Sequence, residues 1–389
     1  MAAPPVYEID PKAFWADPYP DLARMRAEAP IAHVPQLGAT LITRRDTIFR
    51  EEKRIDVFSS DQPEGLMTVL MGQNMMRKDG AAHMAERKAI FPTISPKTVK
   101  AHWLDRFRAA TEEVLAELAP AGRCDLVADY AMPVSAHALR AITGLTNMAW
   151  REMDRVSQGM IDGCANYAGD PEVEAQCHDC TASIDHHIDE MIPVIDAAPD
   201  PSLLSVQRQA GLSDAQVRAN IKLAISGGQN EPRDAIAGAA WAILSHPDQL
   251  ALVQAGEATW LQVFEEYARW ISPIGMSPRR VARPDTVDGV DFTPEERVFL
   301  MFSSGNRDET VFARPDAFDI TQDCSAAISF GAGPHFCAGA WASRALIAEV
   351  ALPMLFERLP GLRLDQTGET RFGGWAFRGP LAVPVVWDA

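Results

Sequence analysis

The sequence has no uninterrupted apolar run of about 18 residues, the length that a membrane-spanning helix needs. Its start, MAAPPVYEIDPKAFW, contains neither the basic segment nor the apolar core of a secretory signal peptide. Internal repeats are absent, and no Gly-, Ser- or Pro-rich linker divides the chain. We therefore expect a cytoplasmic protein without a membrane partner, built as one domain over residues 1–389.

Positive charge is also scarce. The chain has 36 Lys and Arg residues against 53 Asp and Glu residues, a formal net charge of -17. Nucleic acids and anionic lipid surfaces attract basic proteins, so this balance argues against both as partners. The hydrophobic content of 47% is enough for a large core, and small molecules remain the expected ligands.

Cysteines are few, and a chain of 389 residues does not need disulfides for stability. The segment CHDC at residues 177–180, with His186 and His187 downstream, raises the alternative of a zinc site. A structural zinc site needs four ligands in a closed tetrahedron. The stretch 171–192 is helical in pattern and has no turn to fold it back, which favours reduced cysteines on a helix.

Apolar residues recur at spacings of three and four, as an amphipathic helix requires, through most of the chain. The expected helices are residues 83–91, 96–118, 129–143, 148–166, 171–192, 213–244, 247–255, 259–270 and 340–352, the last of which stops at Pro353. Short strands are expected at residues 31–34, 39–42, 277–282, 298–302 and 381–386, and a loop with short helical pieces at 59–80. The sequence predicts a mainly α fold with a small β part.

The segment FGAGPHFCAG, residues 330–339, places a single cysteine among glycines, directly ahead of a predicted helix. Glycine lets a backbone pass close to a flat, bulky group. Unpaired N–H groups at a helix start favour a thiolate, which can ligate haem iron. The alternative is a glycine turn that carries a buried free cysteine.

The whole segment closely resembles the haem-ligand loop of cytochromes P450, in which the cysteine is the proximal ligand. The resemblance covers nearly the whole chain, from Asp10 to Trp387, and is to the soluble bacterial members. It implies the cytochrome P450 fold, haem b (iron protoporphyrin IX) as cofactor and Cys337 as the metal ligand.

Other residues match the same family. His83 and Arg87, four apart on one helix face, match a pair that contacts haem in bacterial members, and His335 matches a propionate ligand. A further propionate ligand is Arg279 by its offset from Glu266, although Arg280 also fits and a one-residue error stays open.

The pair Glu266 and Arg269 lies at spacing i, i+3, which by default indicates a weak surface pair. The resemblance instead implies a buried pair that supports the cysteine side of the haem structurally. No catalytic chemistry is expected of either residue.

The predicted helix 213–244 departs from the family pattern Ala-Gly-x-(Asp/Glu)-Thr, in which the acid and the alcohol relay protons. Residues 227–234 read GGQNEPRD, so the threonine is absent under either possible alignment. A carboxylate at Glu231 can accept a proton from hydrogen peroxide and return it to the leaving oxygen. Asn230 or Gln229 can hold the peroxide or orient Glu231, and Pro232 is expected to kink the helix.

Three functions follow from these patterns. The first is a haem-thiolate oxygenase that uses dioxygen and a ferredoxin partner with its reductase, and the second is a peroxygenase driven by hydrogen peroxide. The third is a haem protein that acts as a sensor or isomerase. The substrate is expected to be small and hydrophobic or aromatic, and the helix carrying Glu231 resembles that of members that demethylate methoxyphenols. The opposing expectation for Glu231 is that it points away and pairs with Arg233 or solvent.

Overall fold

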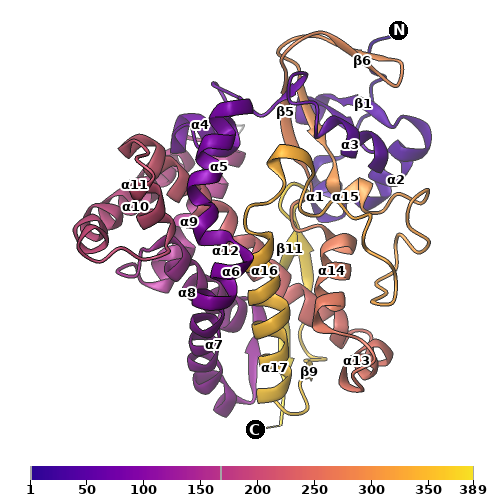
Figure 1. Cartoon of the computed structure of the whole chain (residues 1–389). Helices are drawn as coiled ribbons and strands as arrows, with labels where there is room; N and C mark the ends of the chain where they lie inside the picture. Colours follow the sequence, from indigo (N-terminus) through magenta and orange to yellow (C-terminus); the bar gives the residue numbers. More distant parts are fainter. Residues whose placement is uncertain (1, 167–168, 389) are drawn as a thin grey trace. The chain divides into compact units, whose positions relative to one another are not determined.

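The computed structural model describes residues 2–166 and 169–388 (Figure 1). Contacts along the chain group it into two compact units. Unit 1 comprises residues 1–61, 237–337 and 366–383, and unit 2 comprises residues 62–236, 338–365 and 384–389. The chain passes between the units several times, so no single linker separates them, and the prediction of one domain stays a prediction.

Unit 1 contains most of the β structure. Its helices are α1 (Pro11–Ala16), α2 (Tyr19–Glu28), η1 (Pro35–Leu37), α3 (Arg45–Glu51), α13 (Pro247–Gln254), α14 (Trp260–Ile271), α15 (Phe302–Gly305) and η6 (Gly333–His335). Its strands are β1 (Ile31–Val34), β2 (Ala39–Ile42), β3 (Phe58–Ser59), β5 (Ser277–Val281), β6 (Asp285–Val287), β7 (Val290–Phe292), β8 (Arg297–Leu300), β10 (Arg371–Gly373) and β11 (Gly379–Ala382).

Five strands of unit 1 form one sheet in the order β1-β2-β8-β5-β3. The pair β2 and β8 is parallel, and the other neighbours are antiparallel. Apolar side chains such as Val281 and Val298 fill one core of this unit, while Phe14 and Leu41 belong to a second. The sheet thereby fixes β5, the strand that carries Arg279 and Arg280.

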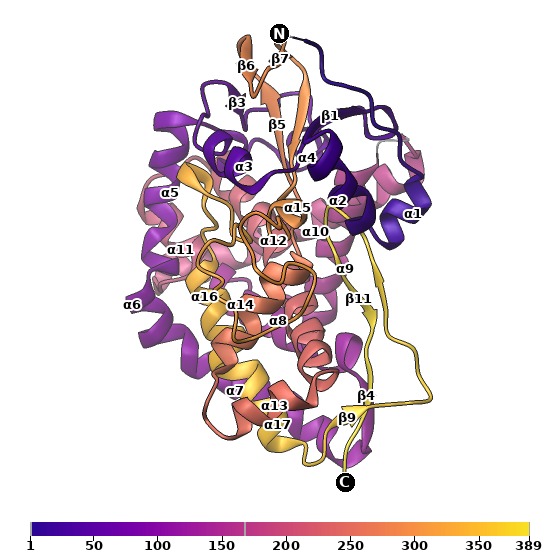
Figure 2. The ribbon, with the colours of Figure 1, turned by 90° about the vertical axis from the view of Figure 1, so that its right-hand side faces the viewer.

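Unit 2 is almost entirely helical. Its helices are α4 (Leu66–Met71), η2 (Met75–Arg77), α5 (Gly80–Ile94), α6 (Pro96–Thr98), η3 (Val99–Trp103), α7 (Leu104–Leu118), η4 (Ala119–Ala121), η5 (Leu126–Ala131), α8 (Met132–Thr143), α9 (Trp150–Ala165), α10 (Pro171–Ala197), α11 (Leu203–Gln209), most of α12 (Asp214–Leu244), α16 (Ala340–Leu346), η7 (Ile347–Ala351) and α17 (Leu352–Arg358). Strands β4 (Arg123–Asp125), β12 (Pro384–Val386) and β9 (Arg363–Leu364) form a small sheet close to the C-terminus (Figure 2).

Two predicted elements need correction. The helix that begins at Ala340 continues through Pro353 to Arg358. Proline has no N–H and crowds the carbonyl four residues earlier, and the π-type turn of η7 directly before α17 changes the bonding pattern where that conflict arises. The predicted strand 381–386 is two strands, because Pro384 has no N–H to extend the pairing of β11 with β10.

The remaining long elements agree with the sequence patterns. Strands β1 and β2 have the predicted bounds, and α14 begins with a capping box formed by Thr259 and Gln262. The segment Gly333–Arg358 is long and apolar enough to cross a membrane by length and composition, but 56% of that window is buried inside the structure. A buried core helix passes the same test.

Candidate functional site

Cys337 lies in a loop that closes on itself ahead of α16. Its backbone N–H donates to the carbonyl of Phe330 at 2.9 Å, and α16 begins three residues later at Ala340. The side chain is exposed, whereas the other five cysteines are buried or half-buried. The alternative of a glycine turn with a buried free cysteine is therefore wrong as far as burial is concerned.

Two glycines shape this loop. Gly331 and Gly333 have φ values of +71° and +63°, the left-handed region that side chains disfavour. A Cβ on Gly333 would lie 3.0 Å from Cγ of Lys53 and 3.2 Å from the carbonyl oxygen of Glu52. The glycines thus let the loop lie against the residues that follow α3.

Glu266 and Arg269 of α14 form a fully buried ion pair, as the family resemblance implied and contrary to the default surface expectation. Both contacts between guanidinium and carboxylate measure 2.7 Å. Arg269 also donates to three backbone carbonyls, those of Asn306, Pro315 and Ala317. A paired and hydrogen-bonded ion is the form in which charge tolerates burial.

Asn306 connects this pair to the cysteine loop. Its carbonyl accepts from Arg269, and its side-chain oxygen accepts the N–H of Ile328 at 2.7 Å. Its amide nitrogen donates to the Ser329 hydroxyl at 3.1 Å, directly before the loop begins at Phe330. The ion pair therefore positions the start of the loop through two hydrogen-bonded steps.

Arg279 and Arg280 occupy opposite faces of β5. Arg279 is buried and donates to Oε1 of the buried Glu52 at 2.8 Å, while its Nε has no hydrogen-bond partner. Arg280 is partly exposed and binds Glu295 and the carbonyl of Asp61. Since Glu52 also approaches Gly331 of the cysteine loop, the structure brings Arg279 and that loop together within unit 1.

His83 and Arg87 both lie on α5 in unit 2. His83 is buried, and its Nδ1 donates to the carbonyl of Met75 at 2.9 Å. Arg87 is half-buried one turn later on the same face. His335 lies in η6, two residues before Cys337, and is half-buried.

A polar cluster that the sequence did not indicate holds the Met75 segment. Asn220 of α12 accepts the N–H of Met75 at 2.8 Å and donates to Glu86 of α5 at 2.8 Å. Glu86 also accepts from Gln216 and pairs with Lys78. No spacing rule signals such a cluster, since its members come from separate helices.

The stretch Gln229–Glu231 lies inside α12, which runs on through Pro232. Gln229 is fully buried and donates to the Met132 carbonyl at 3.2 Å and to Oδ1 of Asp154 at 3.0 Å. Gln229 and Glu231 are about 200° apart around the helix. The contacts of Gln229 thus favour a structural task on the side facing α8 and α9, and the predicted kink at Pro232 stays a prediction.

Each residue of this segment has one side-chain oxygen without a hydrogen-bond partner. Oδ1 of Asn230 and Oε2 of Glu231 are shielded from solvent without a hydrogen-bond partner, as is Oε1 of Gln229. Burial, with a smaller contribution from Asp234, raises the pKa of Glu231 to about 8, while its own backbone N–H and Arg233 act in the opposite direction. Arg233 pairs with Asp234 and Asp154, and the described ion pairs include none between Arg233 and Glu231. Glu231 is half-buried, so the alternative that it points toward solvent stays open.

The zinc alternative also has no support. Cys177 and Cys180 are buried on α10, and their sulfurs face Gly163 and Gly159 of α9. Burial raises the pKa of the Cys177 thiol to about 11. Within residues 2–166 and 169–388, no group of three or more His, Cys, Asp or Glu side chains is arranged to hold a metal ion.

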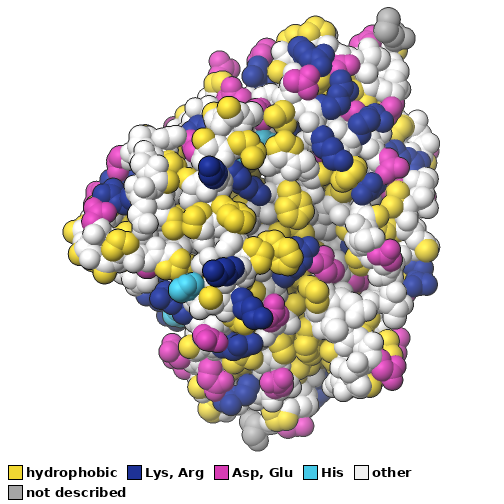
Figure 3. Space-filling model, viewed as in Figure 1, with side chains coloured by type: hydrophobic (Ala, Val, Ile, Leu, Met, Phe, Trp, Pro, Cys, Tyr) yellow, Lys and Arg dark blue, Asp and Glu magenta, His cyan; other side chains and the backbone are white. Residues whose placement is uncertain are grey.

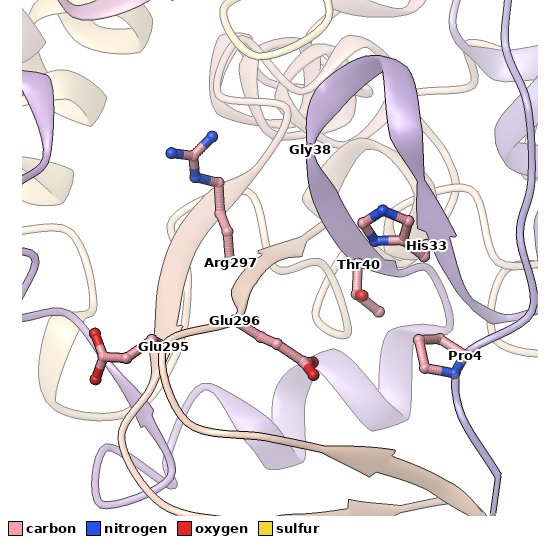
Figure 4. Close-up of a pocket in the computed structure, with 7 residues that line it drawn as sticks. All are labelled: Pro4, His33, Gly38, Thr40, Glu295, Glu296 and Arg297. Atoms are coloured by element: carbon pink, nitrogen blue, oxygen red, sulfur yellow. The ribbon is translucent and has the colours of Figure 1, made fainter.

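A cavity of about 460 Å³ lies in unit 1 and includes Glu295, the partner of Arg280 (Figure 4). Its lining is polar and charged, and the residues are Pro4, His33, Gly38, Thr40, Glu295, Glu296 and Arg297. Acidic and basic side chains are also mixed with apolar ones on the face seen in Figure 3. None of these lining residues is a large aliphatic or aromatic side chain of the kind that encloses most small organic ligands.

Comparisons with known proteins identify the family. The model of the family described as Cytochrome P450 matches residues 261–354, which include the Glu266–Arg269 pair and Cys337. The chain is 27% identical to Cytochrome P450 monooxygenase PikC of Streptomyces venezuelae, covering 99% of this chain and 95% of the relative. It is 25% identical to Steroid C26-monooxygenase of Mycolicibacterium smegmatis, covering 93% and 91% respectively.

Solved structures agree on the fold. The crystal structure of P450BioI in complex with hexadec-9Z-enoic acid ligated Acyl Carrier Protein has a TM-score of 0.88 to this chain, with 20% identity and coverage of 97% and 100%. The fold is thus the mainly α cytochrome P450 fold, and the protein is an oxidoreductase of the haem-thiolate oxygenase class. The family model, the relatives that span nearly the whole chain and the fold together support a cytochrome P450 of the bacterial type.

Haem b is the cofactor of this family, and the residues present fit it. The buried Nε of Arg279 is a donor without a partner, which suits a propionate carboxylate. Cys337 offers an exposed sulfur ahead of a helix. The oxygens of Asn230 and Glu231 suit a small ligand that can donate hydrogen bonds.

Proposed function

We propose that this cytochrome P450 oxidises a small hydrophobic or aromatic molecule, by hydroxylation or O-demethylation, and that hydrogen peroxide supplies the oxygen. The observation that carries the proposal is Glu231, whose Oε2 is shielded from solvent without a hydrogen-bond partner where the family pattern expects an alcohol or its neighbouring acid. A buried carboxyl whose pKa is about 8 exchanges protons near neutral pH.

The chain's residues divide the work as follows. Cys337 ligates the haem iron, and His83, Arg87, Arg279 and His335 bind the propionates. Bound haem supplies the redox chemistry that transfers one oxygen atom to the substrate.

Glu231 moves the protons of the peroxide. Its carboxylate accepts a proton from the peroxide oxygen that will be transferred to the substrate. It returns this proton to the other peroxide oxygen, which leaves as water. Asn230 binds the peroxide through its side-chain amide, and its own burial helps to keep bulk water away from this exchange. Gln229 holds the segment in place through Asp154.

The test uses purified holoenzyme with hydrogen peroxide and no reductase. Substrates are found by a spin-shift screen of methoxy aromatics, terpenoids and fatty acids, and a carbon monoxide difference spectrum establishes the haem-thiolate. We expect product formation that rises with pH toward about 8, since the base must be ionised. Glu231→Gln and Glu231→Thr should lower the peroxide-driven rate by about 10²–10⁴.

A matched control is Glu174→Gln on α10, an exposed glutamate, which should leave the rate unchanged. Unchanged peroxide turnover in both Glu231 variants would rule out the proton role. The alternative function, use of dioxygen with electrons from a ferredoxin and its reductase, is favoured by relatives named monooxygenases. It predicts product only when the redox partner is added.

Three further expectations stand as proposals beside this function. The chain acts as one domain over residues 1–389, it works in the cytoplasm, and it binds neither nucleic acid nor membrane. The third sequence-based alternative, a sensor or isomerase, has no supporting contact among the described residues. Gel filtration of a reconstituted holoenzyme and limited proteolysis test whether the two units separate.

A further inference from the structure

We propose that Asn220 of α12 and Glu86 of α5 position His83 to bind a haem propionate, by fixing the backbone turn to which the His83 ring is hydrogen-bonded. The inference rests on the proposed role of His83 as a propionate ligand and deepens it. Asn220 and Glu86 act through His83, so both are positioning residues. All three residues belong to unit 2.

The His83 ring takes its orientation from the backbone of Met75. Nδ1 of His83 lies 2.9 Å from the Met75 carbonyl oxygen, and His83 is only 1% exposed. A carbonyl oxygen only accepts hydrogen bonds, so Nδ1 carries a proton and donates it. The direction of the Met75 carbonyl therefore sets the direction of the whole imidazole, including Nε2.

Met75 belongs to the single turn η2, whose shape is fixed by hydrogen bonds of its own. The Arg77 N–H donates to the Asn74 carbonyl at 3.0 Å, and the Met76 N–H donates to Oδ1 of Asn74 at 3.1 Å. Because both bonds close around Met75, its N–H and its carbonyl are held relative to each other. A group that fixes the N–H of Met75 therefore also fixes the carbonyl that faces His83.

Asn220 holds that N–H from α12. Its Oδ1 accepts from Met75 at 2.8 Å, and its Nδ2 donates to Oε2 of Glu86 at 2.8 Å and to Oε1 of Gln207 at 3.0 Å. A backbone N–H only donates and an ionised carboxylate only accepts, so the Asn220 amide has one possible orientation. Asn220 is 1% exposed, which keeps solvent from competing for these bonds.

Glu86 connects these contacts back to α5, three residues after His83. Spacing i, i+3 places the two side chains on one face of the helix. Oε1 of Glu86 accepts from Gln216 at 2.7 Å and pairs with Lys78, which compensates the charge of a carboxylate that is 2% exposed. The contacts form a closed ring that runs from α5 through the turn η2 and α12 back to α5. Such a ring fixes His83 relative to its own helix.

The test measures haem ligation rather than turnover. Resonance Raman spectra of the holoenzyme contain a propionate bending mode that responds to hydrogen bonding of the propionate, and haem transfer to apomyoglobin gives the dissociation rate. We expect Asn220→Ala to shift this mode as His83→Ala does, and to speed haem dissociation by about 3–10-fold, the loss of one hydrogen bond. In the His83→Ala background, Asn220→Ala should shift the mode no further, because Asn220 acts through His83.

A milder pair of variants exchanges the amide and the carboxylate. Asn220→Asp keeps an acceptor for the Met75 N–H but places a second carboxylate beside Glu86, so the propionate mode should shift. Adding Glu86→Gln restores a donor opposite an acceptor and should bring the mode part of the way back. The matched control is Asn147→Ala, an exposed amide of unit 2 that also makes two hydrogen bonds, which should change neither the mode nor the dissociation rate.

A purely structural role of Asn220 gives a different result. Asn220→Ala would then lower the free energy of unfolding and leave the propionate mode unchanged, which would overturn the inference. An equal shift of the mode with and without His83 would overturn it as well. Failure of the proposed ligand role is distinct, because His83→Ala itself would then leave the mode unchanged, and the inference would fall with it.

Discussion

The framework of Glu266, Arg269 and Asn306 and the segment Gln229–Glu231 both contain buried polar atoms. The two regions differ in how completely those atoms are hydrogen-bonded. In the framework every charge is matched: Arg269 contacts a carboxylate and three carbonyls, and Glu266 also accepts from the Asp319 N–H and the Cys324 thiol. In the segment, one side-chain oxygen of each residue lacks a partner.

The difference separates stability from function. A buried acceptor without a partner costs about 1–3 kcal/mol, so each such atom in the segment lowers stability unless a ligand pairs with it. The fully paired charges of the framework suit a structural role in supporting the cysteine loop. The unpaired oxygens of the segment suit the binding of a ligand. Variants in the two regions should therefore fail in different ways.

The largest expected effect is at Cys337, which the framework supports. Cys337→Ser should abolish the thiolate-type carbon monoxide band and oxygenase activity, because a serine hydroxyl is a much weaker iron ligand. The fold should survive, since the side chain is exposed. Cys124→Ser, a half-buried thiol on β4, is the control that should keep the band. An intact thiolate band in Cys337→Ser would contradict the assignment.

Breaking the framework should cost stability. Arg269→Ala leaves Glu266 charged and buried, so the free energy of unfolding should fall by about 3–5 kcal/mol in urea titrations. Arg363→Ala removes an exposed pair with Asp388 and should change it by about 0–1 kcal/mol. If both variants lost the same free energy of unfolding, the buried pair would contribute no more to stability than the exposed pair.

Glu231, in the segment Gln229–Glu231, should make the free energy of unfolding depend on pH. The pKa of Glu231 is about 8 in the folded protein against an ordinary value of 4.5, so the native state binds more protons between these values. The free energy of unfolding should therefore fall as the pH rises through this window. Glu231→Gln should remove this contribution, on the order of a few kcal/mol at about 1.4 kcal/mol per pKa unit. Identical pH profiles for both proteins would refute it.

The smallest effect concerns the glycine loop. Gly333→Ala forces a side chain into the left-handed region and against Lys53, and should lower the free energy of unfolding by about 1–2 kcal/mol or more. Gly211→Ala has a similar φ of +76° but open space around it, so it isolates the backbone cost. A smaller loss at Gly333 than at Gly211 would show that the contact with Lys53 is not tight.

Local patterns predicted much of this molecule. Apolar spacing located α9, α12 and α14, and the predicted bounds of β1 and β2 were right, because these signals depend on neighbours in the chain. The prediction that the helix stops at Pro353 was wrong. Proline usually ends a helix, but the π-type turn directly before α17 accommodates it here. The short strands β4 and β9 were missed, since their two or three residues carry no period.

Some properties of the site also follow from local sequence, and others follow only from the tertiary structure. The sequence by itself determined the cysteine loop, the absence of a threonine near Glu231 and the overall acidity, because residue identity and spacing suffice for these. Only the tertiary structure decided that Glu266 and Arg269 are buried, that Arg279 is buried beside Glu52, and that Oε2 of Glu231 lacks a partner while Arg233 pairs with Asp154. These properties depend on burial and on contacts between distant segments, which no spacing along a chain records.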